Sequence, residues 1–182
     1  MAIRADDLQH FSVDEYLRLY AAEPDALERT ELLNGVIFTL SPESRLHATA
    51  VRFVDELLNE IYGGRSQRNG SVQMGDSSLW DPDVYVLRSD WGEGQYLLAD
   101  EVELVVEVCL NTQARDLHDK LDGYAAAGIP TYWVISPTEP GWAIVHGQLV
   151  NGAYHSVQRV DLPHGYSDLT TELVQRLTRA TS

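Results

Sequence analysis

The fold is decided by two stretches, Asp81-Pro82-Asp83-Val84-Tyr85-Val86 and Glu103-Leu104-Val105-Val106-Glu107-Val108. The second is almost continuously apolar, which is typical of a strand in a sheet that is covered on both faces. In the first, alternation places Asp81 and Asp83 on one face of a strand expected over residues 79–87. Glu107 either forms an outward salt bridge at a strand end or is a buried carboxylate, which requires a partner or a metal ion.

Helical patterns and a hairpin precede these strands. Ser12-Val13-Asp14-Glu15 is a capping box that predicts a helix ending at Pro24. Asn34-Gly35 lies between two β-prone runs and predicts a hairpin over residues 31–38. After Ser41-Pro42, apolar residues at helical spacing predict a second helix that Gly63-Gly64 ends; they are Ala50, Phe53, Val54, Leu57, Leu58 and Ile61.

The remaining pattern alternates between strands and helices. We expect a weak strand over 71–75, a loop over 88–100, a helix over 114–127 that ends before Gly128, and a buried strand over 132–135. Further antiparallel strands follow at 142–145 and 154–160, with turns at Gly147 and Asn151-Gly152, and then a helix over 168–177. This order predicts one mixed α/β (α+β) domain, residues 1–182, with a central sheet flanked by helices and additional antiparallel hairpins.

Composition narrows the class of protein. The chain has 182 residues and a net charge of −15, from 13 basic and 28 acidic residues, which argues against a broad nucleic-acid footprint. A single cysteine, Cys109, excludes an internal disulfide framework and a Cys-rich zinc module. With no signal peptide pattern and no apolar run of membrane-spanning length, we expect a cytoplasmic protein without a membrane partner.

Carboxylates at neighbouring strand ends suggest a metal site. Asp83 and Glu107, with the backbone carbonyl of Val108, supply the oxygen ligands that Mg²⁺ or Mn²⁺ prefers. Lys120 is the only lysine among the 13 basic residues, and it lies on the following helix beside the apolar face of Leu117, Leu121 and Tyr124. There its ammonium could orient a metal-bound water, with Glu31 as a fourth polar member.

Other candidates are weaker. His47 could contact a phosphate or be a partly exposed helix residue. Trp80 and Trp91 flank the expected site and could stack on a base, although packing is the simpler interpretation. Cys109 is expected to be a small buried residue rather than a nucleophile. No histidine pair has metal-ligand spacing, and no Gly-rich phosphate loop follows a strand, so zinc and nucleotide sites are not expected.

Taken in order, these motifs resemble the PD-(D/E)XK nuclease superfamily, and within it the Uma-type restriction endonucleases, formerly a domain of unknown function. The resemblance covers most of the chain, from Phe11 to Leu173. Its motifs are Glu31-Leu32-Leu33-Asn34-Gly35-Val36-Ile37, Ser41-Pro42 with His47, Pro82-Asp83, Leu104-Val105-Val106-Glu107-Val108, Asp116-Leu117 with Lys120-Leu121 and Tyr124, and Tyr132-Trp133-Val134-Ile135.

The resemblance implies a restriction-endonuclease-like core and a Mg²⁺-dependent endonuclease acting on DNA, typically as a homodimer. It makes Asp83 and Glu107 metal ligands, Lys120 the group that positions water or stabilises charge, and Glu31 an additional acid. The superfamily's usual lysine position holds Cys109, and in the Uma-type branch the lysine lies on the next helix, where Lys120 matches it.

Two departures touch loops near the site. Leu110-Asn111-Thr112 replaces a Ser-Pro-Ser-Thr type turn, and Ser136 replaces an acidic residue. The main alternative is a catalytically inactive module that keeps the nuclease fold for binding or interaction, which the acidic composition favours. A glycosidase with paired carboxylates is a remote third option that gives Lys120 no role.

Overall fold

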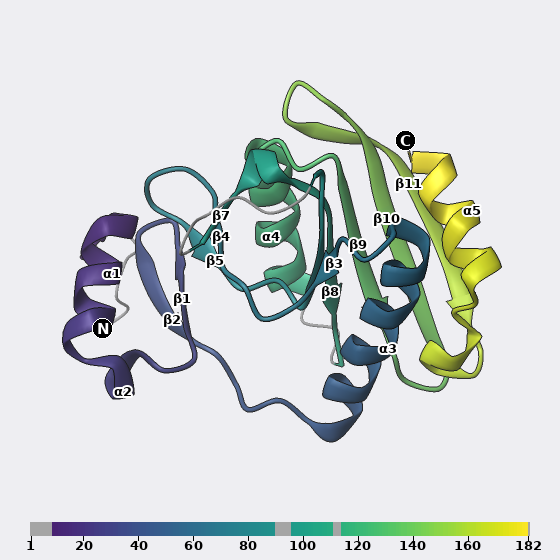
Figure 1. Ribbon diagram of the computed structural model, residues 1–182, viewed down its shortest axis with the longest axis horizontal. Coiled ribbons are helices and arrows are strands. Elements are labelled where there is room, and N and C mark those ends of the chain that lie inside the picture. Colours follow the sequence, from purple (N-terminus) through teal and green to yellow (C-terminus); the bar gives the residue numbers. More distant parts are fainter. Residues whose placement is uncertain (1–8, 90–95, 111–113, 182) are drawn as a thin grey trace.

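The computed structural model describes residues 9–89, 96–110 and 114–181 (Figure 1). The side chains of residues 114–119, 180 and 181 lie outside the description. The helices are α1 (Val13–Ala22), α2 (Pro24–Leu27), α3 (Arg45–Tyr62), α4 (Ala114–Ala126) and α5 (Thr171–Thr181). The strands are β1 (Thr30–Leu33), β2 (Val36–Thr39), β3 (Ser66–Gln67), β4 (Val72–Gln73), β5 (Leu79–Trp80), β6 (Val84–Leu87), β7 (Leu97–Leu98), β8 (Val102–Val108), β9 (Thr131–Ser136), β10 (Gly141–Val150) and β11 (Ala153–Leu162).

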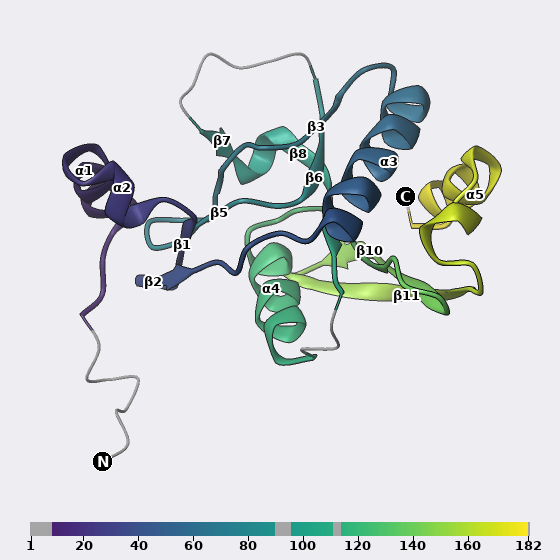
Figure 2. The same cartoon turned by 90° about the horizontal axis from the view of Figure 1, so that it is seen from below.

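A six-stranded sheet in the order β11-β10-β9-β8-β6-β3 forms the centre of the molecule. Strands β8 and β9 are parallel, and α4 makes the crossover between them. Helices α3 and α5 cover one face, and α4 lies on the other (Figures 1 and 2). Because both faces are covered, β8 is buried along most of its length, as its apolar sequence predicts.

A five-stranded sheet in the order β2-β1-β5-β4-β7 lies beside the central sheet. Val13 and Tyr16 of α1 pack against Leu32 and Leu79 of this sheet, which together form a separate small core. Trp80 joins the two sheets, because it packs in one apolar cluster with side chains of β6, β8 and α4. The N-terminal hairpin is thereby held next to the ends of the central strands, which brings Glu31 of β1 close to them.

The predicted strand over 79–87 is wrong. The structure breaks it at Asp81-Pro82-Asp83 into β5, which pairs with β4 and β1 in the five-stranded sheet, and β6, which pairs with β8 in the central sheet. Pro82 has no backbone N–H to donate to a ladder, which explains why neither sheet continues through it. Asp81 and Asp83 therefore do not share a face of one strand.

The other elements agree with the predictions except at four places. Pro24 ends α1 but also begins α2. β10 runs through Gly147 without a turn, and the chain reverses only at Asn151-Gly152. The last helix begins at Thr171, after the short 3₁₀ helix Gly165–Asp168. The predicted loop over 88–100 contains β7 in its described part. Within the described ranges, no helix is long and apolar enough to cross a membrane.

Candidate active site

The pairing of β6 with β8 brings two predicted site residues together. Val84 lies opposite Val106 in this antiparallel pair, so Asp83, which precedes β6, comes beside Glu107 near the end of β8. Successive side chains of β8 point to opposite faces: Val106 and Val108 enter the cluster under α3, while Val105 packs on the α4 side. Glu107 therefore faces α4, the helix that carries Lys120.

Glu107 is a buried carboxylate with two hydrogen-bond donors on one oxygen. Lys120 Nζ donates to its Oε1 over 2.9 Å, and the Tyr124 hydroxyl donates to the same atom over 2.6 Å. Burial raises the pKa of Glu107 to about 7, and Lys120 acts in the opposite direction. The expectation of an outward salt bridge is therefore wrong, because the partners of Glu107 lie inside the molecule.

Lys120 joins two carboxylates from different parts of the chain. Besides its contact with Glu107, its Nζ lies 3.6 Å from Glu31 Oε1. Burial lowers the pKa of Lys120, but the charges of Glu107 and Glu31 outweigh this effect, and the net pKa is raised. The lysine is therefore an ammonium at neutral pH, held as a fixed positive charge and hydrogen-bond donor.

Glu31 reaches the site from β1 and is also buried. Its Oε1 accepts a hydrogen bond of 2.9 Å from the backbone N–H of Asp81. Burial raises its pKa, and Lys120 opposes this shift. Asp81 thus contributes its backbone N–H to the site, while its side chain is exposed.

Asp83 is fixed by α3 and by β8. Its Oδ2 accepts a hydrogen bond of 2.6 Å from the backbone N–H of Val108 and lies 3.2 Å from His47 Nε2. The hydrogen bond to Asp83 raises the pKa of His47, against the lowering effect of burial. His47 is half-buried, so it is not a simple exposed helix residue, and its contact with a phosphate stays a prediction.

These side chains line an open cleft of about 380 Å³, which we call the carboxylate cleft. Five carboxylates border it, those of Glu31, Glu43, Asp81, Asp83 and Glu107. The described side chains that can carry positive charge there are Arg29, Lys120 and His47. Because the carboxylates outnumber the positive groups, the cleft attracts cations. An anionic substrate would be repelled unless a bound cation offset this negative charge.

The donor set fits a hard divalent cation with few protein ligands. Asp83 Oδ1, Glu107 Oε2 and the Val108 carbonyl are all oxygens, as Mg²⁺ prefers, and within the described part of the chain neither carboxylate oxygen accepts a hydrogen bond. No cluster of three or more His, Cys, Asp or Glu side chains in that part is arranged to hold an ion. Two carboxylates, a carbonyl and several waters are the coordination expected for Mg²⁺.

Sequence reasoning missed Tyr124 as a polar member of the site. It was assigned to the apolar face of α4, and it is fully buried, but its hydroxyl binds Glu107. Its position four residues after Lys120 is the signal, because residues at i and i+4 share a helix face.

Two of the weaker candidates are placed by the structure. Trp80 packs in the core. Cys109 packs against the apolar cluster on the α4 side as expected, but it is only partly buried and lines the carboxylate cleft. Trp91 and the Asn111-Thr112 turn lie outside the described residues, as do the Asp116 and Leu117 side chains.

The fold and the cleft together define a restriction-endonuclease-like α/β protein. Residues 13–178 match the family Uma2, described as "putative restriction endonuclease", and the chain belongs to this family. A crystal structure of a protein from Anabaena variabilis, titled a "putative nuclease belonging to DUF820", has the same fold. Its TM-score is 0.65 at 17% identity, over 92% of this chain and 98% of that chain. A comparison with curated proteins gave no match.

Proposed function

We propose that this chain is a metal-dependent endonuclease that hydrolyses phosphodiester bonds of DNA. The observation that carries the proposal is the contact of the only lysine with Glu107 and Glu31, in the cleft that also contains Asp83. Membership of the restriction endonuclease family supports it. The resemblance further implies a homodimer, which sedimentation analysis tests, and the sequence pattern predicts a cytoplasmic protein.

In this proposal Asp83, Glu107 and the Val108 carbonyl hold Mg²⁺ or Mn²⁺. A bound ion would lower the pKa of a water molecule and offset charge on the phosphate. His47 and the Val108 N–H fix the orientation of Asp83, and Tyr124 fixes Glu107. The protein therefore presents pre-oriented oxygens, which reduces the reorganisation needed on binding.

Lys120 acts as a charge stabiliser and orienting donor for the attacking water. Burial lowers its pKa, but the charges of Glu107 and Glu31 raise it by more, which favours the ammonium form. Its ammonium can donate hydrogen bonds to the attacking water and to the phosphate oxygens. Glu31 keeps this ammonium at the end of the central strands.

Nicking of supercoiled plasmid with Mg²⁺ or Mn²⁺ tests the proposal. We expect the wild type to nick, and Lys120→Ala and Lys120→Arg to lose roughly 100-fold or more of the rate, as when a transition-state donor is removed. Arg18→Ala is the matched control, because it removes one exposed positive charge on α1. Metal-dependent nicking that survives in Lys120→Ala would overturn the role of the lysine.

The second candidate function is a binding module that keeps the fold without catalysis. The net charge of −15 favours it, because most of the surface repels a duplex. Metal binding without cleavage of plasmid or of single strands would support this alternative and contradict the enzyme.

A further inference from the structure

A second hollow adjoins the carboxylate cleft on the side of α1. It has a volume of about 220 Å³, and three of its lining residues are tyrosines, Tyr16, Tyr20 and Tyr96. We call it the tyrosine pocket. It shares Arg29 and Asp81 with the carboxylate cleft, so the two hollows are neighbours at these residues.

The tyrosine pocket has the size and lining of a site for one planar ring. Tyr16 forms a fixed wall, because it is buried and its hydroxyl donates to the Thr30 carbonyl over 2.8 Å. Tyr20 is 43% exposed, and its ring centroid lies 6.5 Å from that of Tyr16. A cavity of about 150 Å³ holds benzene, so a pocket of 220 Å³ admits a ring of nucleobase size.

Arg29 lies between the tyrosine pocket and the carboxylate cleft. Its guanidinium donates to the Ser41 carbonyl, which leaves other N–H donors of the fork. Among the described residues it forms no ion pair, whereas Lys120 is bound by Glu107 and Glu31. Its backbone is left-handed, with φ of 62°, and its carbonyl accepts the Leu40 N–H over 2.8 Å, so the position of the residue is fixed.

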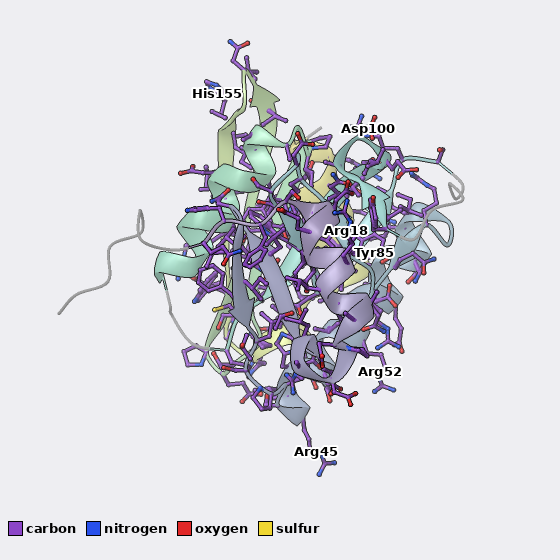
Figure 3. The ribbon with its side chains drawn as sticks, turned by 90° about the vertical axis from the view of Figure 1, so that its left-hand side faces the viewer. Arg18, Arg45, Arg52, Tyr85, Asp100 and His155 are labelled. Carbon is purple, nitrogen blue, oxygen red and sulfur yellow. The ribbon has the colours of Figure 1, made fainter. Side chains whose placement is uncertain are left out.

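The charge pattern favours one strand over two. A duplex is bound mainly through many Lys and Arg contacts to phosphates, and five carboxylates border this cleft. On α3, Arg45 and Arg52 project into solvent (Figure 3) and line none of these hollows. Single strands need fewer cations, because their bases stack on aromatic side chains.

We propose that the tyrosine pocket holds one unpaired base of the substrate, while Arg29 binds the phosphate that joins this base to the nucleotide in the carboxylate cleft. The substrate is then a single-stranded or locally unpaired nucleic acid. This inference rests on the proposed nuclease function and narrows its substrate class.

The test measures binding of fluorescein-labelled oligonucleotides by anisotropy, with Ca²⁺ present to support binding. The probes are a single DNA strand, a single RNA strand and a DNA duplex of about 20 nucleotides, longer than the roughly 4–16 that a single-strand groove covers. We expect the wild type to prefer the single strands. Tyr20→Ala should weaken that binding roughly 5- to 150-fold, the effect of one lost stacking contact.

Matched controls separate the pocket from general effects. Leu19→Ala changes the neighbouring exposed side chain of α1, which does not line the pocket, and should bind normally. Arg29→Ala should reduce the slope of log affinity against log salt by about 0.7, the value for one phosphate contact on a single strand. Arg18→Ala, whose side chain does not line the pocket, should leave the slope unchanged.

A strand of abasic units, which keeps the phosphates but has no bases, measures how much the bases contribute to binding. The wild type should bind it as weakly as Tyr20→Ala binds the normal strand, and Tyr20→Ala should bind both strands equally. If nicking persists while Tyr20→Ala matches Leu19→Ala, or while the wild type prefers the duplex, the base pocket is overturned and the nuclease stands. A wild type that neither binds nor cleaves any probe overturns the nuclease proposal together with the pocket.

Discussion

At the scale of single residues, the site depends on how a carboxylate is kept inside an apolar strand. Glu107 has Val106 and Val108 as neighbours, and burial alone would keep it neutral at moderately acidic pH. Lys120 and Tyr124 both donate to one of its oxygens. Glu107 also lines the carboxylate cleft, so in the proposed site its second oxygen would be the one that binds the metal ion.

Tyr124→Phe removes one of these donors and tests how it orients Glu107. Burial raises the pKa of Glu107 to about 7, so at about pH 8 the hydrogen bond goes to a charged acceptor, and we expect a loss of about 1.5–3 kcal/mol in the free energy of unfolding there. Nicking by the folded protein should also fall, and the metal concentration for half-maximal rate should rise. Thermal denaturation and a metal titration of the rate measure both effects.

Tyr154→Phe is the control for Tyr124→Phe. It also loses a hydroxyl hydrogen bond, here partly buried and 2.8 Å long, to the neutral Ile129 carbonyl, but Tyr154 does not line the carboxylate cleft. It should destabilise by about 1 kcal/mol with normal nicking. Equal activity of the two variants would show that Tyr124 has only a packing role.

Asp83→Asn tests the proposed metal ligand without disturbing the fold. A ligand at 100 times its dissociation constant stabilises a protein by about 2.7 kcal/mol, which raises Tm by roughly 5–10 °C at this chain length. We expect Mn²⁺ to give such a rise in the wild type and none in Asp83→Asn, with similar Tm values without metal. Thermal scans with and without Mn²⁺ measure this.

The neighbouring carboxylate supplies the control for this measurement. Asp81 borders the same cleft, but it is not assigned as a ligand, so Asp81→Asn should keep most of the metal-induced rise in Tm. A full metal response in Asp83→Asn would remove Asp83 from the ligand set.

At the scale of elements, local signals were predictable and long-range pairing was not. The capping box at Ser12, the Asn34-Gly35 hairpin and the glycine stop at Gly63 each depend on a few adjacent residues, and all three are present. The break at Pro82 assigns β5 and β6 to different sheets. That outcome depends on partners such as Leu32 and Val106, which are distant in the sequence.

The candidate site also has a part that the sequence predicts and a part that depends on tertiary packing. Asp83, Glu107, Lys120 and Glu31 were expected together, and their side chains line one cleft. The contact between His47 and Asp83 was not predictable, because it depends on how α3 packs across the central sheet. Residue types and spacing identify the charged groups, whereas tertiary packing decides which of their atoms remain free.

The helix α4 has to lie close to the five-stranded sheet for Lys120, which is bound to Glu107 of the central sheet, to reach Glu31 on β1 as well. Gly123 makes this approach possible, because a Cβ at that position would lie 2.1 Å from the ring of Trp80. Trp80 is buried and makes an edge-on contact with Tyr124, with 4.9 Å between ring centroids. Glycine is unfavourable inside a helix, but at this position its missing side chain lets α4 pack directly against Trp80.

Gly123→Ala should therefore destabilise the protein although alanine is the better helix former. Overpacking costs about 1–3 kcal/mol, against a gain in helix propensity of about 1 kcal/mol. We expect a lower urea midpoint and reduced nicking, since a displaced α4 moves Lys120. Asp122→Ala, an exposed change on the same helix, should have neither effect; a more stable Gly123→Ala would show that Trp80 can move aside.

At the scale of the whole molecule, charge limits how a nucleic acid can be bound. The chain carries −15, and in the described structure only Arg29 and Lys120, with His47, offer positive charge at the carboxylate cleft. Affinity must then come from a few phosphate contacts, from stacking and from a bound cation. Such binding differs from that of basic proteins, in which counterion release dominates.

The salt dependence of single-strand binding tests this limit. Each phosphate contact contributes about −0.7 to the slope of log affinity against log salt, so two or three contacts predict a slope of about −1.4 to −2.1. Affinity should then fall only about 7- to 18-fold between 50 and 200 mM salt, measured by anisotropy at constant Ca²⁺. A slope steeper than about −4 would require a basic surface away from the cleft, because Arg29 and Lys120 cannot supply that many contacts.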